Sequence, residues 1–485
     1  MQTDGYKLDH RRQYPAGTEK VYANWTARGS RIPGVDKVVF VGLQAAIQRR
    51  LMEDFEAFFE ADVDEVCAEY QKMLDSYLGP NSIGTEHIRA LHTLGYLPLE
   101  FKALPEGTRV PLRVPMFTVE NTHPDFFWLT NYFETILSAE LWLPMTSATM
   151  AVRIREAIDF WAMQTTGSTE GTGFLGHDFS MRGMAGAGAA NLSGMGHLVA
   201  FTGTETVPVL RYIQDYYPFT GFLAGTVPAT EHSVMCAGGD ENERETFERL
   251  LDLYPKGFLS VVSDTWDFWN VLTNVIPSLH DRIMSRDGRL VVRPDSGDPA
   301  DIICGTEGRD GATPEERGAI QLLWDEFGGT TNDKGYKVLD PHVGLIYGDA
   351  MNFDRIEEIN SRLAYRGFAS TNWVAGIGSY NYQYQTRDTF GFAMKATNVV
   401  IGGEEKAIFK DPKTDSGTKR SLKGRIVVLR GDDGELQALD EMTDSSDIER
   451  YLSAQSLLET VWKDGKFVKY LGFDEVRRNV GLVSQ

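Results

Sequence analysis

The chain of 485 residues is long enough to bury a large core, as more than one domain or as one barrel with additions. Its formal charge of −21 argues against nucleic acid or an anionic membrane as the main partner, because both attract a basic face. A phosphorylated small molecule stays possible, since it needs only a local cluster of Arg and Lys.

Cysteine usage and the N-terminus indicate the compartment. The three cysteines, Cys67, Cys236 and Cys304, are scattered, which is typical of free thiols in a reducing environment. The N-terminal sequence MQTDGYKLDHRRQYP lacks the apolar stretch of a signal peptide, and no uninterrupted apolar run approaches a membrane span. We therefore expect a cytoplasmic protein that binds neither nucleic acid nor membrane.

The first 165 residues mix strand and helix patterns. Residues 20–31 (KVYANWTARGSR) alternate as a strand does. Residues 125–143 and the following segment 148–164 (ATMAVRIREAIDFWAMQ) repeat apolar residues at helical spacing. This combination predicts an N-terminal α+β domain over residues 1–165.

Seven short apolar segments follow, and most of them are separated by a helical pattern. Such alternation indicates parallel βαβ units, and seven repeats without a dinucleotide-binding fingerprint favour a barrel over an open sheet. We therefore predict an irregular seven-stranded (β/α) barrel over residues 166–384, of fold class α/β. Its strands are expected at residues 177–182, 199–204, 221–227, 258–264, 290–295, 343–349 and 368–376.

Beyond residue 384 the pattern changes again. Residues 386–400 (TRDTFGFAMKATNVV) alternate like a strand, and residues 410–425 (KDPKTDSGTKRSLKGR) form a basic, turn-rich stretch. The polar tail, residues 431–485, carries short strand and helix signals. We expect residues 385–485 to pack on the N-terminal part, so that both ends of the chain build one second domain.

The predicted barrel strands end where apolar residues give way to charged residues, hydroxyls or glycine. In a parallel barrel these carboxyl ends form one rim, which carries the chemistry. The rim gathers cations that can bind phosphate oxygens and carboxylates that can hold a hydrated divalent metal or ribose hydroxyls. Its members are Arg182, Glu205, Glu231, His232, Asp264, Arg293, Asp295, Gly348, Asp349, Gly376 and Gly378. This combination fits a sugar polyphosphate substrate.

Each of these motifs also has a structural interpretation. RPDSG, residues 293–297, is a turn sequence, and His232 could cap a helix or sit satisfied in a loop. GIGSYN lacks the third glycine of a dinucleotide loop, and no Walker sequence occurs. His177 and His197 are interpreted as structural. Two aromatic residues, Phe179 and Tyr6, are candidates to enclose a flat aromatic ligand.

Taken together, ten motifs of this chain resemble those of a known family. In order along the chain they are DGYKLDHRRQYP, VYANWTARGSR, HDFSMRG, HLVAFTGTETV, TVPATEHS, SVVSDTWDFWN, VVRPDSGDP, YGD, TRD and FKDP…KRSLKGR. On these motifs the chain resembles the nicotinamide phosphoribosyltransferase family of type II phosphoribosyltransferases. The resemblance implies transfer of ribose 5-phosphate from phosphoribosyl pyrophosphate to nicotinamide, giving nicotinamide mononucleotide and pyrophosphate in NAD salvage.

The resemblance also implies roles for matched residues. His232 corresponds to the catalytic histidine that ATP phosphorylates transiently, with Glu231 beside it, and Asp295 would face the cationic centre that develops at C1. The remaining rim roles are pyrophosphate binding by Arg182, His232 and Arg293, ribose binding by Asp295, Gly348 and Asp349, and Mg²⁺ binding by Asp264 and Asp295. Basic contacts to the 5′-phosphate and nucleotide tail would come from Arg387, Lys395 and Lys419.

The pyridine ring and the assembly follow from the same resemblance. Phe179 corresponds to one wall of the ring site. Tyr6 corresponds to the other wall and, with Asp4 and Arg28, would come from the neighbouring subunit. A site shared between chains implies a homodimer. The implied cofactors are Mg²⁺ and ATP, the latter as a stimulating co-substrate.

Two positions depart from the family pattern. Glu205 in GTETV stands where the family usually has Asp, whose carboxylate accepts a hydrogen bond from the nicotinamide amide. Glutamate keeps the charge, adds a methylene and should still repel nicotinate. GIGSY replaces a GSGGG-type loop, so that Gly378 and Ser379 stand at a phosphate contact where Ser379 would use its own hydroxyl or N–H.

Three alternatives stay open. Nicotinate phosphoribosyltransferase shares the fold and the ATP-coupled histidine, but a nicotinate site would prefer a cation or neutral donors at Glu205. A barrel glycosidase or aldolase would need a close carboxylate pair or a buried Lys, and leaves Arg182 and Arg293 unexplained. A non-catalytic interaction or signalling protein on the same fold would be expected to lack His232, Asp295 or Arg293.

Overall fold

A computed structural model describes residues 2–306, 311–348, 351–414, 421–441 and 456–482. The chain divides into two compact units. Unit 1 comprises Met1–Thr149, Tyr212–Thr220 and Gln385–Val480, and unit 2 comprises Met150–Arg211, Gly221–Tyr384 and Gly481–Gln485. Along the described ranges, no helix is both long enough and apolar enough to span a membrane.

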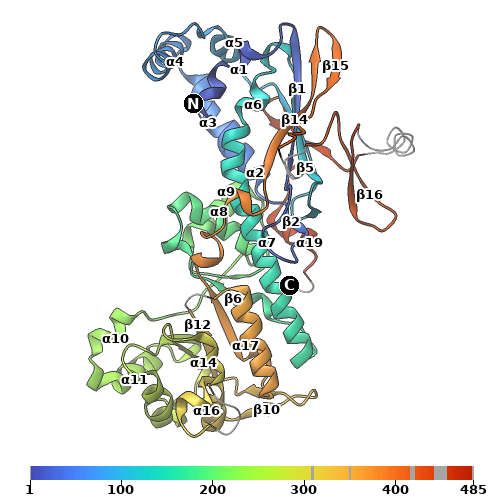
Figure 1. The fold of residues 1–485 in the computed structure, drawn as a ribbon. Helices are drawn as coiled ribbons and strands as arrows, with labels where there is room; N and C mark the ends of the chain where they lie inside the picture. Colours follow the sequence, from blue (N-terminus) through green and yellow to red (C-terminus); the bar gives the residue numbers. More distant parts are fainter. Residues whose placement is uncertain (1, 307–310, 349–350, 415–420, 442–455, 483–485) are drawn as a thin grey trace. The chain divides into compact units, whose positions relative to one another are not determined.

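Unit 1 is built on an antiparallel sheet to which both ends of the chain contribute (Figure 1). The seven strands follow the order β15 (Glu404–Ala407), β14 (Ala393–Ile401), β1 (Thr18–Thr26), β5 (Pro115–Asn121), β3 (Leu99–Ala103), β18 (Glu459–Lys463) and β19 (Lys466–Phe467). Two small pairs, β2 (Lys37–Val39) with β4 (Arg109–Pro111) and β16 (Val427–Arg430) with β17 (Leu436–Leu439), complete the strands. The expected domain built from both termini is therefore confirmed.

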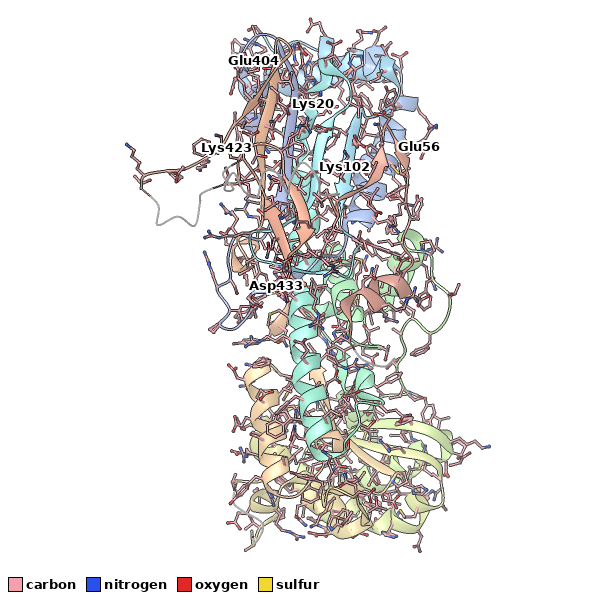
Figure 2. The ribbon with its side chains drawn as sticks, turned by 90° about the vertical axis from the view of Figure 1, so that its right-hand side faces the viewer. Lys20, Glu56, Lys102, Glu404, Lys423 and Asp433 are labelled. Carbon is pink, nitrogen blue, oxygen red and sulfur yellow. The ribbon has the colours of Figure 1, made fainter. Side chains whose placement is uncertain are left out.

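The register of this sheet separates an apolar face from a charged one. Trp25 pairs with Phe117, which pairs with Ala103, and all three lie in the buried core. One residue along each strand, Asn24, Thr118 and Lys102 fall on the opposite face, because successive side chains alternate. Figure 2 shows Lys20 and Lys102 on this sheet.

Helices α2 (Leu43–Ala46), α4 (Val63–Leu78), α5 (Glu86–Leu94) and α6 (Leu129–Tyr132) bury residues in the core on the apolar face of this sheet, and a longer helix, α7 (Glu134–Thr165), runs from unit 1 into unit 2. The other helices of unit 1 include α1 (His10–Gln13), α3 (Asp54–Glu60) and α19 (Phe473–Val480). The two helical patterns on either side of Pro144 form one helix, α7 (Glu134–Thr165). Proline removes a single backbone hydrogen bond there, while Leu141 and Met145 stay fully buried in the core.

Unit 2 is a ring of parallel strands, as expected. The sheet runs β7 (Gly203–Thr204), β6 (Gly176–Asp178), β13 (Trp373–Ile377), β12 (Val343–Tyr347), β9 (Asp287–Arg293) and β8 (Lys256–Val262). Single parallel bridges from Gly225 to Gly203 and from Ala229 to Ser260 connect its two edge strands. The seventh segment therefore closes the ring, which confirms the α/β barrel class.

Three strand predictions need correction. Residues 221–227 form an isolated bridge and no strand, because the following Pro228 has no N–H to extend a ladder. Within residues 199–204 only the last two are extended; Phe201 N–H instead donates to the His197 carbonyl and continues a helical turn. Strand β6 ends at Asp178, and Met181–Gly183 is a short 3-10 helix, η5.

Helices surround the ring on its outer side. They are α8 (Ala187–Leu198), α9 (Val207–Tyr216), α10 (His232–Gly238), α11 (Glu243–Leu253), α12 (Phe268–Asn270), α13 (His280–Met284), α14 (Pro299–Cys304), α15 (Pro314–Arg317), α16 (Ala319–Phe327) and α17 (Phe353–Tyr365). Helix α14 packs against α16 and α17, and α16 contacts β12 (Figure 1). A hairpin of β10 (Gly329–Thr331) and β11 (Lys337–Leu339) lies outside the main sheet.

Glu243 at the start of α11 makes stability depend on pH. Burial, with the Asp267 carboxylate nearby, raises its pKa from 4.5 to about 7, and its Oε1 has no hydrogen-bond partner among the described residues. The folded chain therefore holds this proton more tightly than the unfolded chain, so stability falls as pH rises from about 4.5 to 7.

Glu243→Gln is therefore expected to raise the free energy of unfolding at pH 8 more than at pH 4.5, measured by urea denaturation. Glutamine cannot ionise, so it removes the cost of a buried charge that exists only at the higher pH. Glu241→Gln, an exposed neighbour in the chain, is the matched control. An equal effect of Glu243→Gln at both pH values would contradict this prediction.

Candidate active site

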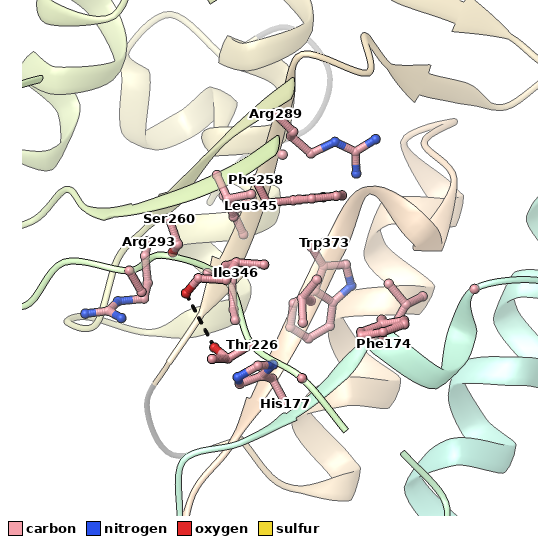
Figure 3. Close-up of a pocket in the computed structure, with 18 of the residues that line it drawn as sticks. Phe174, His177, Thr226, Phe258, Ser260, Arg289, Arg293, Leu345, Ile346 and Trp373 are labelled. Carbon is pink, nitrogen blue, oxygen red and sulfur yellow. Dashed lines mark hydrogen bonds between the residues drawn. The ribbon is translucent and has the colours of Figure 1, made fainter. Parts of the chain in front are cut away.

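A cavity of about 660 Å³ lies inside the ring of unit 2 (Figure 3). Alternate residues of β9, namely Arg289, Val291 and Arg293, line it, because successive side chains of a strand point to opposite faces. Arg293 ends the strand at the rim, and Arg289 lies toward its start. The volume is within the range of small-molecule sites.

Glu205 lies in this cavity with its carboxylate held by two donors. His177 Nε2 is 2.9 Å from Glu205 Oε1, and the Thr226 hydroxyl donates to the same oxygen. Burial alone would raise the pKa of Glu205, but these hydrogen bonds and the nearby His177 and Arg293 hold it below its ordinary value. Glu205 is therefore a carboxylate at neutral pH.

Phe179 follows β6 directly and lines the same cavity. Its ring centroid lies 5.0 Å from that of His177, and its N–H donates to the Ile377 carbonyl at 2.9 Å. Arg182, in η5, is exposed. The Ser379 hydroxyl occupies the space beside Gly183, so the loop after β13 lies against η5 and a side chain at Gly183 would displace it.

The TVPATEH segment is bound to the ends of β8 and β9. Ser260 N–H donates to the Pro228 carbonyl, and Thr230 N–H donates back to the Ser260 carbonyl. Arg293 Nη2 donates to the Thr230 carbonyl at 2.8 Å. These bonds hold Glu231 and His232 at the rim, where α10 begins.

His232 lies among two aspartates. Its Nε2 is 3.8 Å from Asp264 Oδ1 and 3.7 Å from Asp295 Oδ2, and its Nδ1 is 3.2 Å from the Thr265 hydroxyl. The His232 side chain is 47% exposed, whereas that of Asp264 is 5% exposed. A half-exposed imidazole thus faces a buried carboxylate, an arrangement that leaves one side of the ring open to a ligand.

Asp295 is packed against Gly348. A Cβ at position 348 would collide with Asp295 Oδ1, so only glycine leaves the carboxylate in its place. Asp295 also lies 3.8 Å from Arg293 Nε, and its backbone N–H donates to Asp264 Oδ2 at 2.8 Å. A Cβ at Gly376 would likewise collide with the Tyr347 carbonyl and the backbone of Gly348. Asp349, expected beside Gly348, lies outside the described residues.

The predicted residues of unit 1 form a separate charged cluster. Tyr6 Oη donates to Asp4 Oδ2 at 3.3 Å, and burial, with Asp4 and Glu134 nearby, raises the pKa of Tyr6. Lys395 Nζ lies 3.4 Å from Glu134 Oε1, and burial lowers the pKa of Lys395.

Arg28 and Arg387 are two further predicted residues of unit 1. Arg28 Nε donates to the Gly391 carbonyl at 2.9 Å, and Arg387 lies 3.3 Å from Asp388. Lys419 lies outside the described residues.

Sequence reasoning missed several residues of these clusters. His177, interpreted as structural, contacts Glu205, and Thr226 donates to the same oxygen. Lys7 is buried and its Nζ lies 2.7 Å from Glu134 Oε2, so that Glu134 holds Lys7 and Lys395 together. No spacing within a segment signals the contact of His177 with Glu205, because β6 ends at Asp178 and Glu205 follows β7.

Family profiles match both parts of the chain. That of the nicotinate phosphoribosyltransferase family matches residues 174–466, and that of the nicotinamide phosphoribosyltransferase N-terminal domain matches residues 1–99. A protein of Acinetobacter baylyi named nicotinamide phosphoribosyltransferase is 49% identical over 98% of this chain and 96% of its own length. Proteins of the same name from Mycoplasma pneumoniae and Xanthomonas campestris pv. campestris are 37% and 32% identical, over 87% and 98% of this chain and 94% and 97% of theirs.

Solved structures share the fold. Nicotinate-nucleotide pyrophosphorylase from Pyrococcus furiosus superposes with a TM-score of 0.58, and human nicotinic acid phosphoribosyltransferase with 0.54. Each is 17% identical and covers 99% of this chain and 93% of its own. Profile and relatives together show that this chain belongs to the nicotinate phosphoribosyltransferase family, among members named nicotinamide phosphoribosyltransferase.

Proposed function

We propose that this protein transfers ribose 5-phosphate from phosphoribosyl pyrophosphate to nicotinamide, giving nicotinamide mononucleotide and pyrophosphate in NAD salvage. Membership of the family makes the chain a phosphoribosyltransferase, a class of pentosyltransferase. The observation that carries the choice of nicotinamide is the carboxylate of Glu205 in the cavity beside Phe179. We call the part of the cavity lined by His177, Phe179, Glu205 and Thr226 the pyridine pocket.

The state of Glu205 supports an amide ligand. Its low pKa keeps it charged, and both hydrogen bonds that it accepts within the described residues go to Oε1. Oε2 is then available to accept an amide N–H of nicotinamide. The carboxylate of nicotinate would instead meet a like charge, which disfavours nicotinate as a substrate.

The transfer breaks the bond between C1 of the ribose and a pyrophosphate oxygen and forms a bond from C1 to the pyridine nitrogen. Cationic charge develops at C1, and the leaving pyrophosphate gains negative charge. Arg293, buried at the rim, and the exposed Arg182 would bind the pyrophosphate. Asp295, held against Gly348, would face the developing cation, and Gly348 itself would allow the ribose to approach.

ATP stimulation through His232 is the second part of the proposal. The imidazole is half-exposed, which suits attack on the γ-phosphorus of ATP; the bond from this phosphorus to the β–γ bridging oxygen would break, ADP would leave and a phosphohistidine would form. Asp264 and Asp295 lie within 4 Å of its Nε2 and would hold the ring in place. Glu231, the neighbour of His232, accepts a hydrogen bond from the Ser233 hydroxyl.

Asp264 and Asp295 also fit a Mg²⁺ ion. Asp264 Oδ1 is buried and has no hydrogen-bond partner among the described residues, and oxygen ligands suit this metal. Within the described residues no group of three or more His, Cys, Asp or Glu side chains is placed to hold a metal ion, but Mg²⁺ commonly uses one or two carboxylates with waters and phosphates. When bound, Mg²⁺ would neutralise charge on the pyrophosphate.

Part of unit 1 would serve the same reaction from a second copy of the chain. We propose a cytoplasmic homodimer in which Tyr6 forms the second wall of the pyridine pocket, with Asp4 and Arg28 beside it. Tyr6 is 66% exposed, which suits an aromatic residue that meets a partner. The remaining basic contacts, to phosphates of the substrates, would come from Arg387, Lys395, Lys419 and the loop at Gly378 and Ser379.

A product assay tests the proposed function. The purified protein with Mg²⁺ and phosphoribosyl pyrophosphate is given nicotinamide or nicotinate, with and without ATP, and products are separated by chromatography. Nicotinamide mononucleotide, formed faster with ATP, is expected. Nicotinate mononucleotide alone would favour nicotinate phosphoribosyltransferase. No product from either base would favour a non-catalytic protein on this fold.

Glu205→Ala is expected to raise the KM for nicotinamide at least about tenfold, because a hydrogen bond to a charged acceptor is lost. The KM for phosphoribosyl pyrophosphate should change much less. Glu205→Gln keeps the shape and removes the charge, so it should increase the use of nicotinate relative to nicotinamide. Equal changes in both KM values for Glu205→Ala would contradict the amide contact.

A further inference from the structure

Asp178 is a buried carboxylate that the proposed reaction does not use. It is the last residue of β6, directly before Phe179, and its side chain has no solvent exposure. A buried carboxylate is costly unless hydrogen bonds satisfy it. Its hydrogen-bond partners therefore indicate which segments of the chain this carboxylate positions.

Three donors surround this carboxylate. Thr204 and Thr206 donate their hydroxyls to Asp178 Oδ2 at 2.9 and 2.6 Å. Ser180 donates its backbone N–H to Oδ1 at 2.9 Å. These donors are the residues on either side of Glu205 and the residue after Phe179. One carboxylate thus joins the two segments that present the pyridine pocket.

Backbone bonds reinforce the same connection. Glu205 N–H donates to the Asp178 carbonyl at 2.8 Å, and Thr206 N–H donates to the Thr204 hydroxyl at 3.0 Å. The Thr204 hydroxyl therefore accepts from one group while it donates to Asp178. Its hydrogen has a fixed direction, and the turn that carries Glu205 is held in one conformation.

The charge of Asp178 is maintained by its surroundings. Burial alone would raise its pKa, but His197 and the bonds from Ser180 and Thr206 hold the pKa below its ordinary value. His197 is itself fixed: its Nε2 lies 3.1 Å from the Gly203 carbonyl and its Nδ1 lies 2.7 Å from the Tyr382 hydroxyl. The carboxylate therefore acts as an acceptor for all three donors.

We propose that Asp178 is the positioning residue of the pyridine pocket: its carboxylate fixes Glu205 and Phe179 relative to each other and so sets the affinity for nicotinamide. This inference rests on the proposed function. It assigns no contact with substrate to Asp178. Its effect passes through Thr204, Thr206 and Ser180.

Asp178→Asn is the direct test. Asparagine has a single acceptor oxygen, so it can accept either the two threonine hydroxyls or the Ser180 N–H, and its NH2 group then faces the remaining donor. One of the two segments therefore loses its bond to residue 178. The KM for nicotinamide is expected to rise about tenfold, the loss from weakening one charged hydrogen bond. The KM for phosphoribosyl pyrophosphate should change less than about threefold, because Arg293 and Asp295 do not contact Asp178 among the described bonds.

Thr206→Val gives a second test that leaves the buried carboxylate in place. Valine matches threonine in shape, so the variant removes one donor to Asp178 and should reproduce the rise in nicotinamide KM. Thr206→Ser keeps the hydroxyl and should restore most of the affinity. Thr165→Val is the matched control, because Thr165 is equally buried and hydrogen-bonded, to Trp161 and Ser370.

The outcomes separate this inference from the proposed function. No nicotinamide mononucleotide from the unmodified protein would overturn both. If the unmodified protein is active, unchanged or equally changed KM values in Asp178→Asn and Thr206→Val would overturn the role of Asp178 alone. A rise in the KM for nicotinamide without a rise in the KM for phosphoribosyl pyrophosphate in Thr165→Val would also overturn it. The loss of any buried threonine hydroxyl would then give the same effect.

Discussion

Replacing Arg293 by alanine should lower kcat/KM by at least about 10³-fold, because the rim loses its buried cation at the leaving group. Arg293 is 9% exposed, and its Nε has no hydrogen-bond partner among the described residues while Nη2 holds the Thr230 carbonyl. Nε is thus a buried donor, 3.8 Å from Asp295 Oδ1, at the rim where the pyrophosphate is proposed to bind. Steady-state kinetics with varied phosphoribosyl pyrophosphate measures the loss.

The control for Arg293 is another buried arginine of the same unit. Arg286, just before β9, donates to the Tyr254 and Gly257 carbonyls and is 7% exposed. Arg286→Lys and Arg293→Lys both keep the positive charge and lose the planar set of N–H donors of the guanidinium group. Arg293→Lys is expected to lower kcat/KM by more than its loss of stability explains. Arg286→Lys is expected to lower kcat/KM only as far as it destabilises the fold. Comparable losses in both would remove Arg293 from the reaction.

Replacing His232 by alanine should abolish the stimulation of turnover by ATP. The variant has no imidazole to accept a γ-phosphate, so turnover with ATP should fall to the ATP-independent rate. Incorporation of label from γ-³²P-ATP into the protein should disappear as well. On the same preparation, turnover is measured by chromatography of the product, and labelling by gel electrophoresis without an acid step.

His342 provides the matched histidine. Its Nδ1 lies 2.7 Å from Asp340 Oδ1, so it also pairs with an aspartate, but it precedes β12 at the opposite end of the strands from the rim. His342→Gln should retain both ATP stimulation and labelling. Full ATP stimulation in His232→Ala would remove this histidine from the proposed mechanism.

The ring of unit 2 could be predicted because its strands leave a strong local signal. Runs such as those of β8 and β9 are apolar, β-branched and separated by helical patterns, so local sequence and tertiary packing agree. The same reasoning failed at residues 221–227, which form a single bridge and no strand because Pro228 has no N–H to extend a ladder.

The site could be predicted in its residue types but not in its connections. Arg293, Asp295 and His232 stood out because charged residues at strand ends gather on one rim. The pairs His177 with Glu205 and Asp178 with Thr206 join residues 28 positions apart, at the end of β6 and just after β7. No spacing within either segment reveals which partner the sheet will bring alongside, so the contact of His177 with Glu205 was not predicted.

The way in which the ring closes bears on how His232 can move. Strands β8 and β9 pair over seven residues, whereas the segment that leads to His232 is joined to its neighbours by one bridge on each side. Detaching this segment would therefore break few backbone bonds and leave the continuous strands intact. The residue proposed to carry a phosphoryl group thus follows the segment of the ring with the shortest ladders, whereas Arg293 ends a strand that is paired along its whole length.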